Sequence, residues 1–262
     1  MDLNLTGKIA LVTGSNRGTG EVIARTLAAE GATVIFHSNS QDSPASAAED
    51  LPRAHIVWGD LSSDNGAEQV AEQACAAAGD IDILVNNYGT AAPGKWNTSS
   101  TEDWLEMYQK NVLSAVRLIQ RLTPTMKTNN WGRIVQLGTI GSHQPNAIMP
   151  HYYAAKGALA TMGVSLAKDL ANTGITVNTV SPGYIRTPEL EAGFRLKAEK
   201  KGWGSDWAVI EQKIVETEFP NPCGRIAERQ EVADLVAFIC SDKAGFINGQ
   251  NIRIDGGAVR YV

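Results

Sequence analysis

The stretch that most limits the fold lies near the start of the chain, where a short apolar run leads into a glycine-rich turn. Residues 8–12 read Lys-Ile-Ala-Leu-Val, and residues 13–20 read Thr-Gly-Ser-Asn-Arg-Gly-Thr-Gly. A helical pattern follows, with one apolar stripe formed by Val22, Ile23, Leu27 and Ala28. Glycine lets a backbone approach a pyrophosphate, and a helix N-terminus offers free N–H groups and a positive dipole end. This order predicts a dinucleotide-phosphate site, with an ordinary strand-to-helix turn as the alternative.

The rest of the chain alternates between short apolar runs and helical patterns. The predicted strands are 8–12, 32–37, 54–59, 82–87, 132–138, 175–180 and 250–254, and the predicted helices lie near 20–30, 64–78, 101–127, 152–173 and 228–241. Such alternation implies right-handed crossovers and a parallel sheet that is covered on both faces. We therefore expect residues 1–262 to form a single α/β domain of the Rossmann type, doubly wound, with a mostly parallel seven-stranded sheet. Two smaller domains are the weaker alternative for 262 residues.

Residues 188–222 interrupt this alternation. They carry Phe194, Trp203, Trp207 and Phe219 among many charged residues. A long excursion of this kind is typical of a substrate lid. A pair of amphipathic helices that docks on the body of the domain is the alternative interpretation.

A tyrosine and a lysine lie four residues apart in the segment 151–157, His-Tyr-Tyr-Ala-Ala-Lys-Gly. In a helix, this spacing places Tyr152 and Lys156 on the same face, one turn apart. A nearby ammonium favours the phenolate, so we expect Lys156 to lower the pKa of Tyr152. Tyr152 would then donate a proton to a carbonyl oxygen or accept one from an alcohol. Tyr153 lacks a lysine at this spacing and is expected to be a packing or rim residue.

The motifs occur in an order that resembles the short-chain dehydrogenase/reductase family, on its 3-oxoacyl-carrier-protein-reductase-like branch. They are Thr13-Gly-x-x-x-Gly-x-Gly20, Asn86-Asn-x-Gly89, Asn111, Tyr152-x-x-x-Lys156 and Pro182-Gly183. The resemblance extends from Lys8 to the closing segment 248–257, which is nearly the whole chain. It implies an oxidoreductase that interconverts a ketone and a secondary alcohol by hydride transfer, with a tyrosine as proton relay.

The resemblance also assigns roles to individual residues. Lys156 would bind the nicotinamide ribose, and Asn111 would anchor a water that links Lys156 to solvent, although an asparagine that caps or kinks the helix is the alternative. The cofactor contacts that we expect are Gly14, Asn16, Arg17, Gly18, Thr19, Gly20, Ser38, Asn39, Asp60, Leu61, Asn87, Gly89, Tyr152, Lys156, Pro182, Gly183, Ile185 and Thr187. Asp60 would contact the adenine ring, or it would cap the segment that follows it.

Two positions depart from the family pattern. The family usually has a serine thirteen residues before the tyrosine, whereas this chain has Thr139. Threonine keeps the hydroxyl and adds a methyl group, so we expect Thr139 to orient the reacting oxygen, with Ser142 as the alternative. Tyr88 stands where the family usually has alanine, and we expect it to line the substrate pocket, to pack on the dinucleotide or simply to fill the core.

The identity of the cofactor depends on the charge near the adenosine ribose. An NAD-binding site generally has an acidic residue at the end of the second strand, which repels a 2′-phosphate. Here that strand ends at Phe36-His-Ser-Asn-Ser40, and the first acid is Asp42. Arg17 offers a cation to a phosphate, and Ser38 and Asn39 offer hydrogen bonds. NADP is therefore favoured over NAD.

We expect an NADP-dependent reductase, with an NAD-dependent alcohol dehydrogenase as the alternative. A non-catalytic nucleotide-binding sensor or scaffold is the alternative from another class. The aromatic character of several pocket candidates favours an apolar or aromatic substrate. These candidates are Tyr88, Trp96, Ser142, His143, Met149, Tyr184 and Trp203.

Composition limits the partners and the location. The net charge of −5, without a basic cluster, argues against nucleic acid as a partner. The sequence contains no run of eighteen apolar residues, which argues against a membrane span. Residues 1–6 do not resemble a secretory signal, and three scattered cysteines lack metal-ligand spacing, so we expect buried thiols, a cytoplasmic location and no metal. The resemblance implies a homotetramer in which helices 101–127 and 152–173 pair between subunits and residues 255–262 extend toward another subunit.

Overall fold

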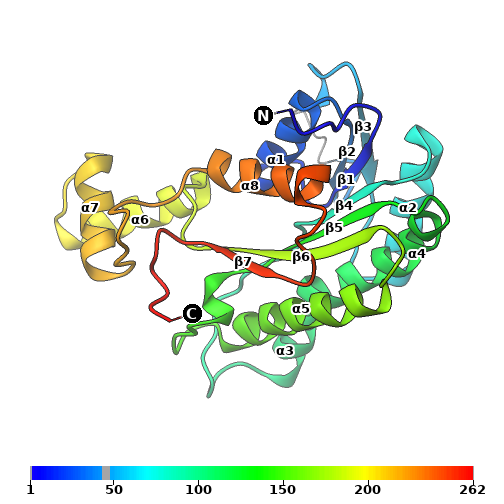
Figure 1. Ribbon diagram of the computed structural model, residues 1–262. Coiled ribbons are helices and arrows are strands. Elements are labelled where there is room, and N and C mark those ends of the chain that lie inside the picture. The colour runs from blue at the N-terminus through cyan, green and yellow to red at the C-terminus, as the bar shows by residue number, and fades with distance from the viewer. Residues whose placement is uncertain (1, 43–47, 262) are drawn as a thin grey trace.

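The computed structural model describes residues 2–42 and 48–261, and in these ranges seven strands form one parallel sheet (Figure 1). The strands are β1 (Ile9–Val12), β2 (Thr33–Ser38), β3 (Ala54–Trp58), β4 (Ile83–Asn86), β5 (Gly132–Leu137), β6 (Ile175–Pro182) and β7 (Asn251–Ile254). Their order across the sheet is β3-β2-β1-β4-β5-β6-β7, and every neighbouring pair is parallel. The prediction of a seven-stranded, doubly wound α/β fold is confirmed.

Helices cover both faces of this sheet. One face packs against α1 (Gly18–Ala29) and α8 (Arg229–Cys240), and the other packs against α2 (Asp64–Ala78), α4 (Ser114–Thr128) and α5 (Pro150–Asp169). A short 3₁₀ helix, η4 (Asp242–Ala244), follows α8. Successive strand residues point to opposite faces, so Val12 joins the first buried cluster and Leu11 joins the second. Burial on both faces explains why the strands are apolar throughout.

The strand order reverses between β1 and β4, which are neighbours in the sheet although β2 and β3 separate them in the sequence. The chain therefore leaves the carboxyl ends of β1 and β4 in opposite directions. In open α/β sheets this arrangement creates a crevice in which ligands bind. The glycine-rich turn after β1 and the segment Asn87–Gly89 after β4 both lie at this crevice.

The predicted helix at 101–127 is divided into three segments. It comprises α3 (Thr101–Tyr108), a π-helical segment η2 (Gln109–Leu113) and α4. Within η2 the Asn111 side chain donates a hydrogen bond to the carbonyl oxygen of Met107 at 3.0 Å, and at the junction with α4 the Ser114 hydroxyl donates to that of Lys110 at 2.7 Å. These local side-chain bonds compete with the regular helical pattern and account for the irregular turn.

Residues 188–222 form a small helical lobe beside the sheet, at the left of Figure 1. It consists mainly of α6 (Pro188–Lys201) and α7 (Trp207–Thr217). The lobe has its own buried cluster, which includes Ala198, Ile210, Ile214 and Phe219, and Tyr184 and Ile140 pack against it. The segment is therefore a pair of helices that packs beside Tyr184 and Ile140, and its role as a substrate lid stays a prediction.

The C-terminal segment lies against its own chain. The Tyr261 hydroxyl donates a hydrogen bond to the carbonyl oxygen of His143, and Arg253 donates to the carbonyl oxygen of Tyr261 at 2.6 Å. Val259 is buried. These hydrogen bonds fix the course of the segment along its own chain, and its extension toward another subunit stays a prediction.

The cysteines also differ from expectation, since Cys75 and Cys223 are exposed and only Cys240 is buried. All three are free thiols. Across residues 2–42 and 48–261, no helix combines the length and the apolar character that crossing a membrane requires.

Candidate active site

The helix that follows the glycine-rich turn begins without a side-chain cap. Its N-cap residue, Arg17, has an extended backbone, and its side chain makes no capping hydrogen bond. By contrast, Ser63 caps α2, Ser100 caps α3 and Thr187 caps α6. Within the ranges that the structure covers, α1 therefore presents uncapped N–H groups beside the open turn at Gly18, where a Cβ would meet nothing within 4 Å. This arrangement suits an anionic group such as a pyrophosphate.

A hydrogen-bond network holds this turn against the end of β4. The Thr13 hydroxyl accepts hydrogen bonds from the backbone N–H groups of Asn87 at 3.0 Å and Tyr88 at 2.9 Å. The Asn87 side chain donates to the carbonyl oxygens of Thr13 at 2.8 Å and Gly14 at 3.0 Å. A Cβ at Gly20 would lie 2.5 Å from the Gly14 oxygen, so only glycine fits there.

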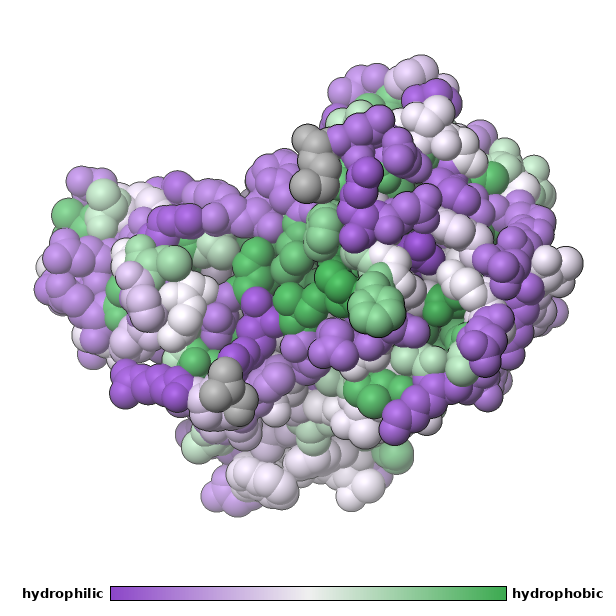
Figure 2. Space-filling model, viewed as in Figure 1, coloured by the Kyte–Doolittle hydropathy of each residue, from purple (hydrophilic) through white to green (hydrophobic). Residues whose placement is uncertain are grey.

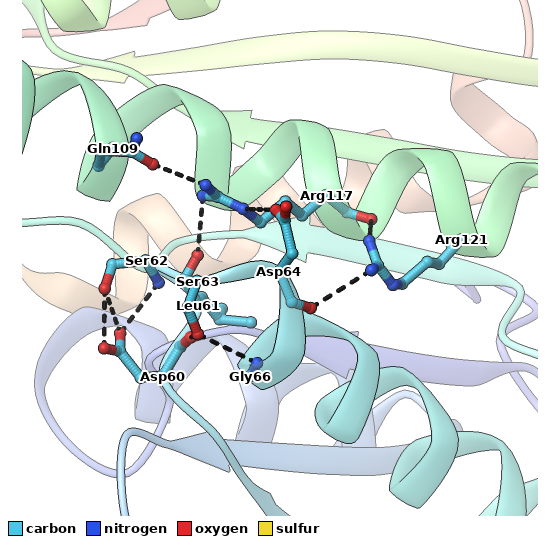
Figure 3. Close-up of polar contacts among 9 residues, drawn as sticks. All are labelled: Asp60, Leu61, Ser62, Ser63, Asp64, Gly66, Gln109, Arg117 and Arg121. Atoms are coloured by element: carbon cyan, nitrogen blue, oxygen red, sulfur yellow. Dashed lines mark hydrogen bonds and ion pairs between the residues drawn. The ribbon is translucent and has the colours of Figure 1, made fainter.

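At the adenosine side, the Asp60 side chain turns back toward its own loop (Figure 3). Its carboxylate accepts hydrogen bonds from the Ser62 backbone N–H at 2.9 Å and from the Ser62 hydroxyl at 2.7 Å. Ser63 then caps α2 by accepting from the Gly66 N–H at 3.1 Å. Asp60 thus organises the segment that follows it, which is the alternative that the sequence left open.

Arg117 of α4 ties this loop to the neighbouring helix, as Figure 3 shows. Its guanidinium donates to the carbonyl oxygen of Leu61 at 3.3 Å and to the Gln109 side chain at 2.6 Å, and it pairs with the carboxylate of Asp64. Leu61 is buried. The sequence did not single out Arg117, because nothing in its local pattern links it to a loop so distant along the chain.

The end of β2 lacks an acidic residue in the structure, as in the sequence. Ser38 is buried, and its hydroxyl donates to the carbonyl oxygen of Ser40 at 2.8 Å, whereas Asn39 is exposed. Arg17 has 79% of its side chain exposed, and its nearest carboxylate is that of Glu189, at 4.0 Å. An exposed guanidinium this far from a carboxylate gains little from the pair and remains available to a phosphate.

Tyr88 faces this adenosine side. Its ring lies edge-on to His37, with the ring centroids 6.0 Å apart, and its pKa is raised by burial, partly offset by a hydrogen bond with the Asn39 side chain. Tyr88 therefore lies beside the expected dinucleotide site, and its role as a substrate-pocket residue stays a prediction.

The crevice contains a cavity of about 170 Å³. Eight of the expected cofactor and catalytic residues line it: Thr19, Asn87, Gly89, Asn111, Tyr152, Lys156, Pro182 and Ile185. Thr90, Ala91, Leu137 and Gly138 complete the lining. Gly183 and Thr187 were also expected to contact the cofactor. In the structure they fix the backbone near this cavity, because the Gly183 N–H donates to the Ile254 carbonyl oxygen at 2.9 Å and the Thr187 side chain caps α6.

Lys156 is almost completely buried in this cavity, with 5% of its surface exposed. Its ammonium donates a hydrogen bond to the carbonyl oxygen of Leu137 at 2.7 Å. Burial lowers the pKa of Lys156 to about 8. A Cβ at Gly89 would lie 2.5 Å from Asn111 Oδ1 and 3.3 Å from Lys156 Nζ, so the three residues meet closely at one point.

The pKa of Tyr152 differs from the expectation. It is raised to about 12, and burial of the phenol is the main cause. A hydrogen bond with the Thr139 side chain lowers the pKa but does not outweigh burial. Lys156 is not among the causes, so the expected lowering by the lysine is wrong for the protein without ligands. In this state Tyr152 is a protonated phenol, ready to donate.

Thr139 lines a second cavity and directly follows Gly138, which lines the first. It precedes the 3₁₀ helix η3 (Ile140–Ser142), and its hydroxyl oxygen accepts from the Gly141 N–H at 3.2 Å. Its hydroxyl hydrogen can donate, and its hydrogen bond with Tyr152 lowers the pKa of that phenol. The Ser142 hydroxyl instead donates back to the Thr139 carbonyl oxygen at 2.7 Å. The geometry therefore favours Thr139 over Ser142 for orienting a reacting oxygen.

The second cavity, of about 280 Å³, begins at Thr139 and ends at the helical lobe and the C-terminal segment. Tyr153, Tyr184 and Phe219 supply its aromatic surface, and the last two stack with their ring centroids 4.7 Å apart. Its polar lining is Gln144, Asn146, Glu218 and Arg260. The Asn146 side chain donates to the Tyr153 hydroxyl at 3.1 Å.

Of the seven pocket candidates from the sequence, only Tyr184 lines this second cavity. Trp96 has 72% of its surface exposed and packs on Trp104, and Trp203 packs against the buried cluster of the lobe. Nε2 of His143 is 2.9 Å from the Asn251 amide nitrogen, and Met149 occupies the N-cap position of α5 without a side-chain hydrogen bond. The Ser142 hydroxyl bonds to the Thr139 carbonyl oxygen, and Tyr88 lies beside His37.

Sequence reasoning missed most of the residues that do line the second cavity. Tyr153 was expected to pack or to lie at the rim, and Asn146, Phe219 and Arg260 were not considered as pocket residues. They come from four separate segments that only the tertiary fold brings together. The adjacency of Tyr153 to Tyr152 was the one local signal that could have indicated it.

Comparison with known proteins places this chain in a family. The family model described as enoyl-(acyl carrier protein) reductase matches residues 14–259. The 3-oxoacyl-(acyl-carrier-protein) reductase of Escherichia coli is 34% identical over 256 residues, which cover 97% of this chain and 98% of that protein.

Two solved structures share the fold over nearly the full length. L-sorbose reductase from Gluconobacter frateurii, complexed with NADPH and L-sorbose, superposes with a TM-score of 0.93 at 31% identity, with all of both chains covered. A 3-oxoacyl-(acyl-carrier-protein) reductase from Agrobacterium tumefaciens with NADP bound has a TM-score of 0.87 at 31% identity, with 98% of this chain and 96% of that chain covered. The chain belongs to the short-chain dehydrogenase/reductase family of oxidoreductases, on the branch that resembles the 3-oxoacyl-(acyl-carrier-protein) reductases.

Proposed function

We propose that this protein is an NADP(H)-dependent reductase that interconverts a small ketone and its secondary alcohol. The observation that carries this proposal is the meeting of Tyr152, Lys156 and Asn111 with the glycine-turn residues in one cavity. Thr139, whose side chain hydrogen-bonds with Tyr152 of that cavity, lines a second cavity that we propose as the substrate site. A protein that only sensed or held a nucleotide would not need this second cavity beside a buried phenol.

A nicotinamide cofactor bound in the crevice would supply the hydride. The residues of the chain would handle the carbonyl oxygen. Thr139 can donate its hydroxyl hydrogen to this oxygen in place of its hydrogen bond with Tyr152, and Tyr152 can transfer its phenolic proton to the same oxygen as negative charge develops. Because burial keeps Tyr152 protonated, the unliganded site is prepared for reduction.

Lys156 and Asn111 would support this proton transfer. The Lys156 ammonium is held by the Leu137 carbonyl, and Asn111 is fixed by hydrogen bonds with both backbone groups of Thr90, at 3.2 Å and 2.9 Å. Both side chains are therefore oriented before any ligand binds. Their proximity at Gly89 supports a role in binding the ribose and in relaying a proton from solvent.

NADP(H) is the proposed cofactor. The absence of an acid on β2 and the exposed guanidinium of Arg17 both favour a 2′-phosphate. The two solved relatives contain NADPH and NADP, which points the same way. An NAD-linked dehydrogenase is the runner-up, and Asp60 and Asp42 are the acids that would have to turn toward the ribose for it.

The proposed substrate is a small ketone that also carries polar groups. The second cavity combines three aromatic rings with Asn146, Glu218 and Arg260, so its lining is more polar than the sequence suggested. Its volume of about 280 Å³ is at the lower end for a ligand pocket. The relative that reduces L-sorbose is consistent with this class of substrate.

We propose that the lobe of α6 and α7 closes this cavity as a lid. Glu218 and Phe219 follow directly after α7 and line the cavity, so a movement of the lobe would change its shape. A homotetramer in the cytoplasm is also proposed. An apolar patch crosses the face shown in Figure 2, in the region where β7 lies in Figure 1, and would suit contact with a second copy.

The test is consumption of NADPH in the presence of ketoses, hydroxyketones, diketones, β-keto esters and aromatic ketones. We expect turnover with at least one hydroxylated ketone, and a loss of at least about a hundredfold in kcat for Tyr152→Phe. NADPH binding by that variant should stay normal. Near-normal turnover in Tyr152→Phe would remove Tyr152 from the mechanism and would reopen the choice of Tyr153.

A further inference from the structure

His37 at the end of β2 is fully buried, and each of its ring nitrogens has one hydrogen-bond partner. The backbone N–H of Gly14 donates to Nδ1 at 2.9 Å, and Nε2 lies 2.9 Å from the carbonyl oxygen of Gly59. A backbone N–H can only donate and a carbonyl oxygen can only accept. The partners therefore fix the neutral ring with its proton on Nε2.

The same residue holds the turn through its backbone. The Ser15 N–H donates to the His37 carbonyl oxygen at 3.0 Å, and the His37 N–H donates to the Ser15 hydroxyl at 3.0 Å. Gly14 has a positive φ of 61°, and its own carbonyl oxygen accepts from Asn87. The first glycine of the turn is therefore held from β2 by His37 and from the β4 side by Asn87.

We propose that neutral His37 is a positioning residue of the cofactor site, which fixes the Gly14 amide and so sets the path of the phosphate-binding turn. This inference rests on the proposed binding of NADP(H) in the crevice. The ring does not need to touch the cofactor, because it acts through the backbone of Gly14. A second ring proton would set an N–H group against the Gly14 N–H and would break this contact.

The electrostatic surroundings support the neutral form. Burial lowers the pKa of His37 to about 4, against smaller effects of the Gly59 carbonyl and the Asp60 carboxylate, which raise it. The Tyr88 ring lies in a T-shaped arrangement with the imidazole, with the ring centroids 6.0 Å apart. The ring is therefore neutral at physiological pH.

Two substitutions separate the two hydrogen bonds of the ring. His37→Asn keeps an acceptor near the position of Nδ1, whereas His37→Gln keeps a donor near the position of Nε2 and loses that acceptor. We expect the Asn variant to bind NADPH with a Kd within about threefold of wild type. The Gln variant should lose about tenfold or more, which is the effect of one net hydrogen bond.

The measurements are the Kd for NADPH and NADH by fluorescence titration, with circular dichroism as the check on folding. In steady state, the loss in the Gln variant should affect the KM for NADPH and leave kcat near the wild-type value. Equal losses in both variants, or unchanged Kd values in both with lowered thermal stability, would overturn the proposal and leave His37 a merely structural role. A wild type that binds neither NADPH nor NADH would overturn the cofactor assignment together with this role.

A measurement on the wild type covers the case in which the Gln variant does not fold. Hydrogen exchange of the Gly14 amide, followed in the peptide spanning the turn, should be slow before any cofactor is added. Fast exchange of this amide in the free protein would show that the ring does not hold it, and the proposal would fall.

Discussion

Replacing Lys156 with methionine should stabilise the fold while it removes the activity. Lys156 is almost completely buried, and its ammonium donates its hydrogen bond to the Leu137 carbonyl oxygen. The pKa of the ammonium falls from 10.5 to about 8 because burial disfavours the charge. Methionine is close in length and carries no charge, so it should fill the same space at small cost in packing.

The magnitude follows from the linkage between pKa and stability. A fall from 10.5 to about 8 means that the charged side chain costs about 3 kcal/mol of unfolding free energy below pH 8. Loss of the hydrogen bond to the Leu137 carbonyl oxygen lowers the unfolding free energy of the variant by about 1 kcal/mol. We therefore expect Lys156→Met to raise the unfolding free energy by about 2 kcal/mol near pH 7.

The dependence on pH provides the sharper test. Between about pH 8 and 10.5 the native state has lost the lysine proton while the unfolded state retains it, so wild-type stability rises with pH relative to the variant. The difference in unfolding free energy between the variant and the wild type should fall by about 2 kcal/mol between about pH 7 and pH 9.5.

The assay is urea unfolding of both proteins at equal concentration and at both pH values. Lys168→Met, an exposed lysine on the same helix, is the control and should change the unfolding free energy by less than about 0.5 kcal/mol at either pH. A variant that is less stable than wild type near pH 7, or an advantage that does not change with pH, would refute the reasoning that the buried ammonium is costly.

Other predictions concern the hydroxyl, the cofactor and the assembly. Thr139→Ser should keep or improve activity, whereas Thr139→Ala should lower kcat by about tenfold or more. If Ser142→Ala lowers kcat and Thr139→Ala does not, the roles of the two residues are reversed. Arg17→Ala should weaken the binding of NADP(H) by about ten- to a hundredfold and leave the binding of NAD(H) unchanged. An equal loss of affinity for both would show that Arg17 binds the pyrophosphate or stabilises the turn itself. Light scattering at micromolar concentration should give the mass of a tetramer, and the mass of one chain would reject that assembly.

The sheet and the glycine-rich turn could be predicted because their signals are local. Apolar runs such as residues 8–12 are bounded by turns, and the glycines of residues 13–20 stand where the backbone needs them. The break in the helix at Asn111 was harder to locate, because a single side chain bonding to Met107 shifts the pattern without changing its periodicity. The sequence therefore left both interpretations of Asn111 open: an anchor for a water molecule, or a residue that caps or kinks the helix.

The lining of the proposed substrate cavity could not be predicted from residue type. Trp96 and Trp203 were chosen because they are aromatic, but one lies on the surface and the other packs on the lobe. Phe219 and Arg260 line the cavity only because the lobe and the C-terminal segment fold back to Thr139. The direction of the Tyr152 pKa shift was missed for a similar reason, since burial outweighs any effect of the four-residue spacing from Lys156.

Hydride transfer from NADPH to a ketone is tested by following the transferred hydrogen. NADPH deuterated at the reactive carbon of the nicotinamide is incubated with the protein and a panel of ketones that includes hydroxyketones, and any alcohol product is analysed by mass spectrometry. We expect one deuterium on the carbinol carbon with the wild type and none with Tyr152→Phe, which should still bind NADPH. Binding of NADPH by a folded wild type without deuterium in any product of the ketone panel would contradict this expectation and would indicate a nucleotide-binding protein without this chemistry.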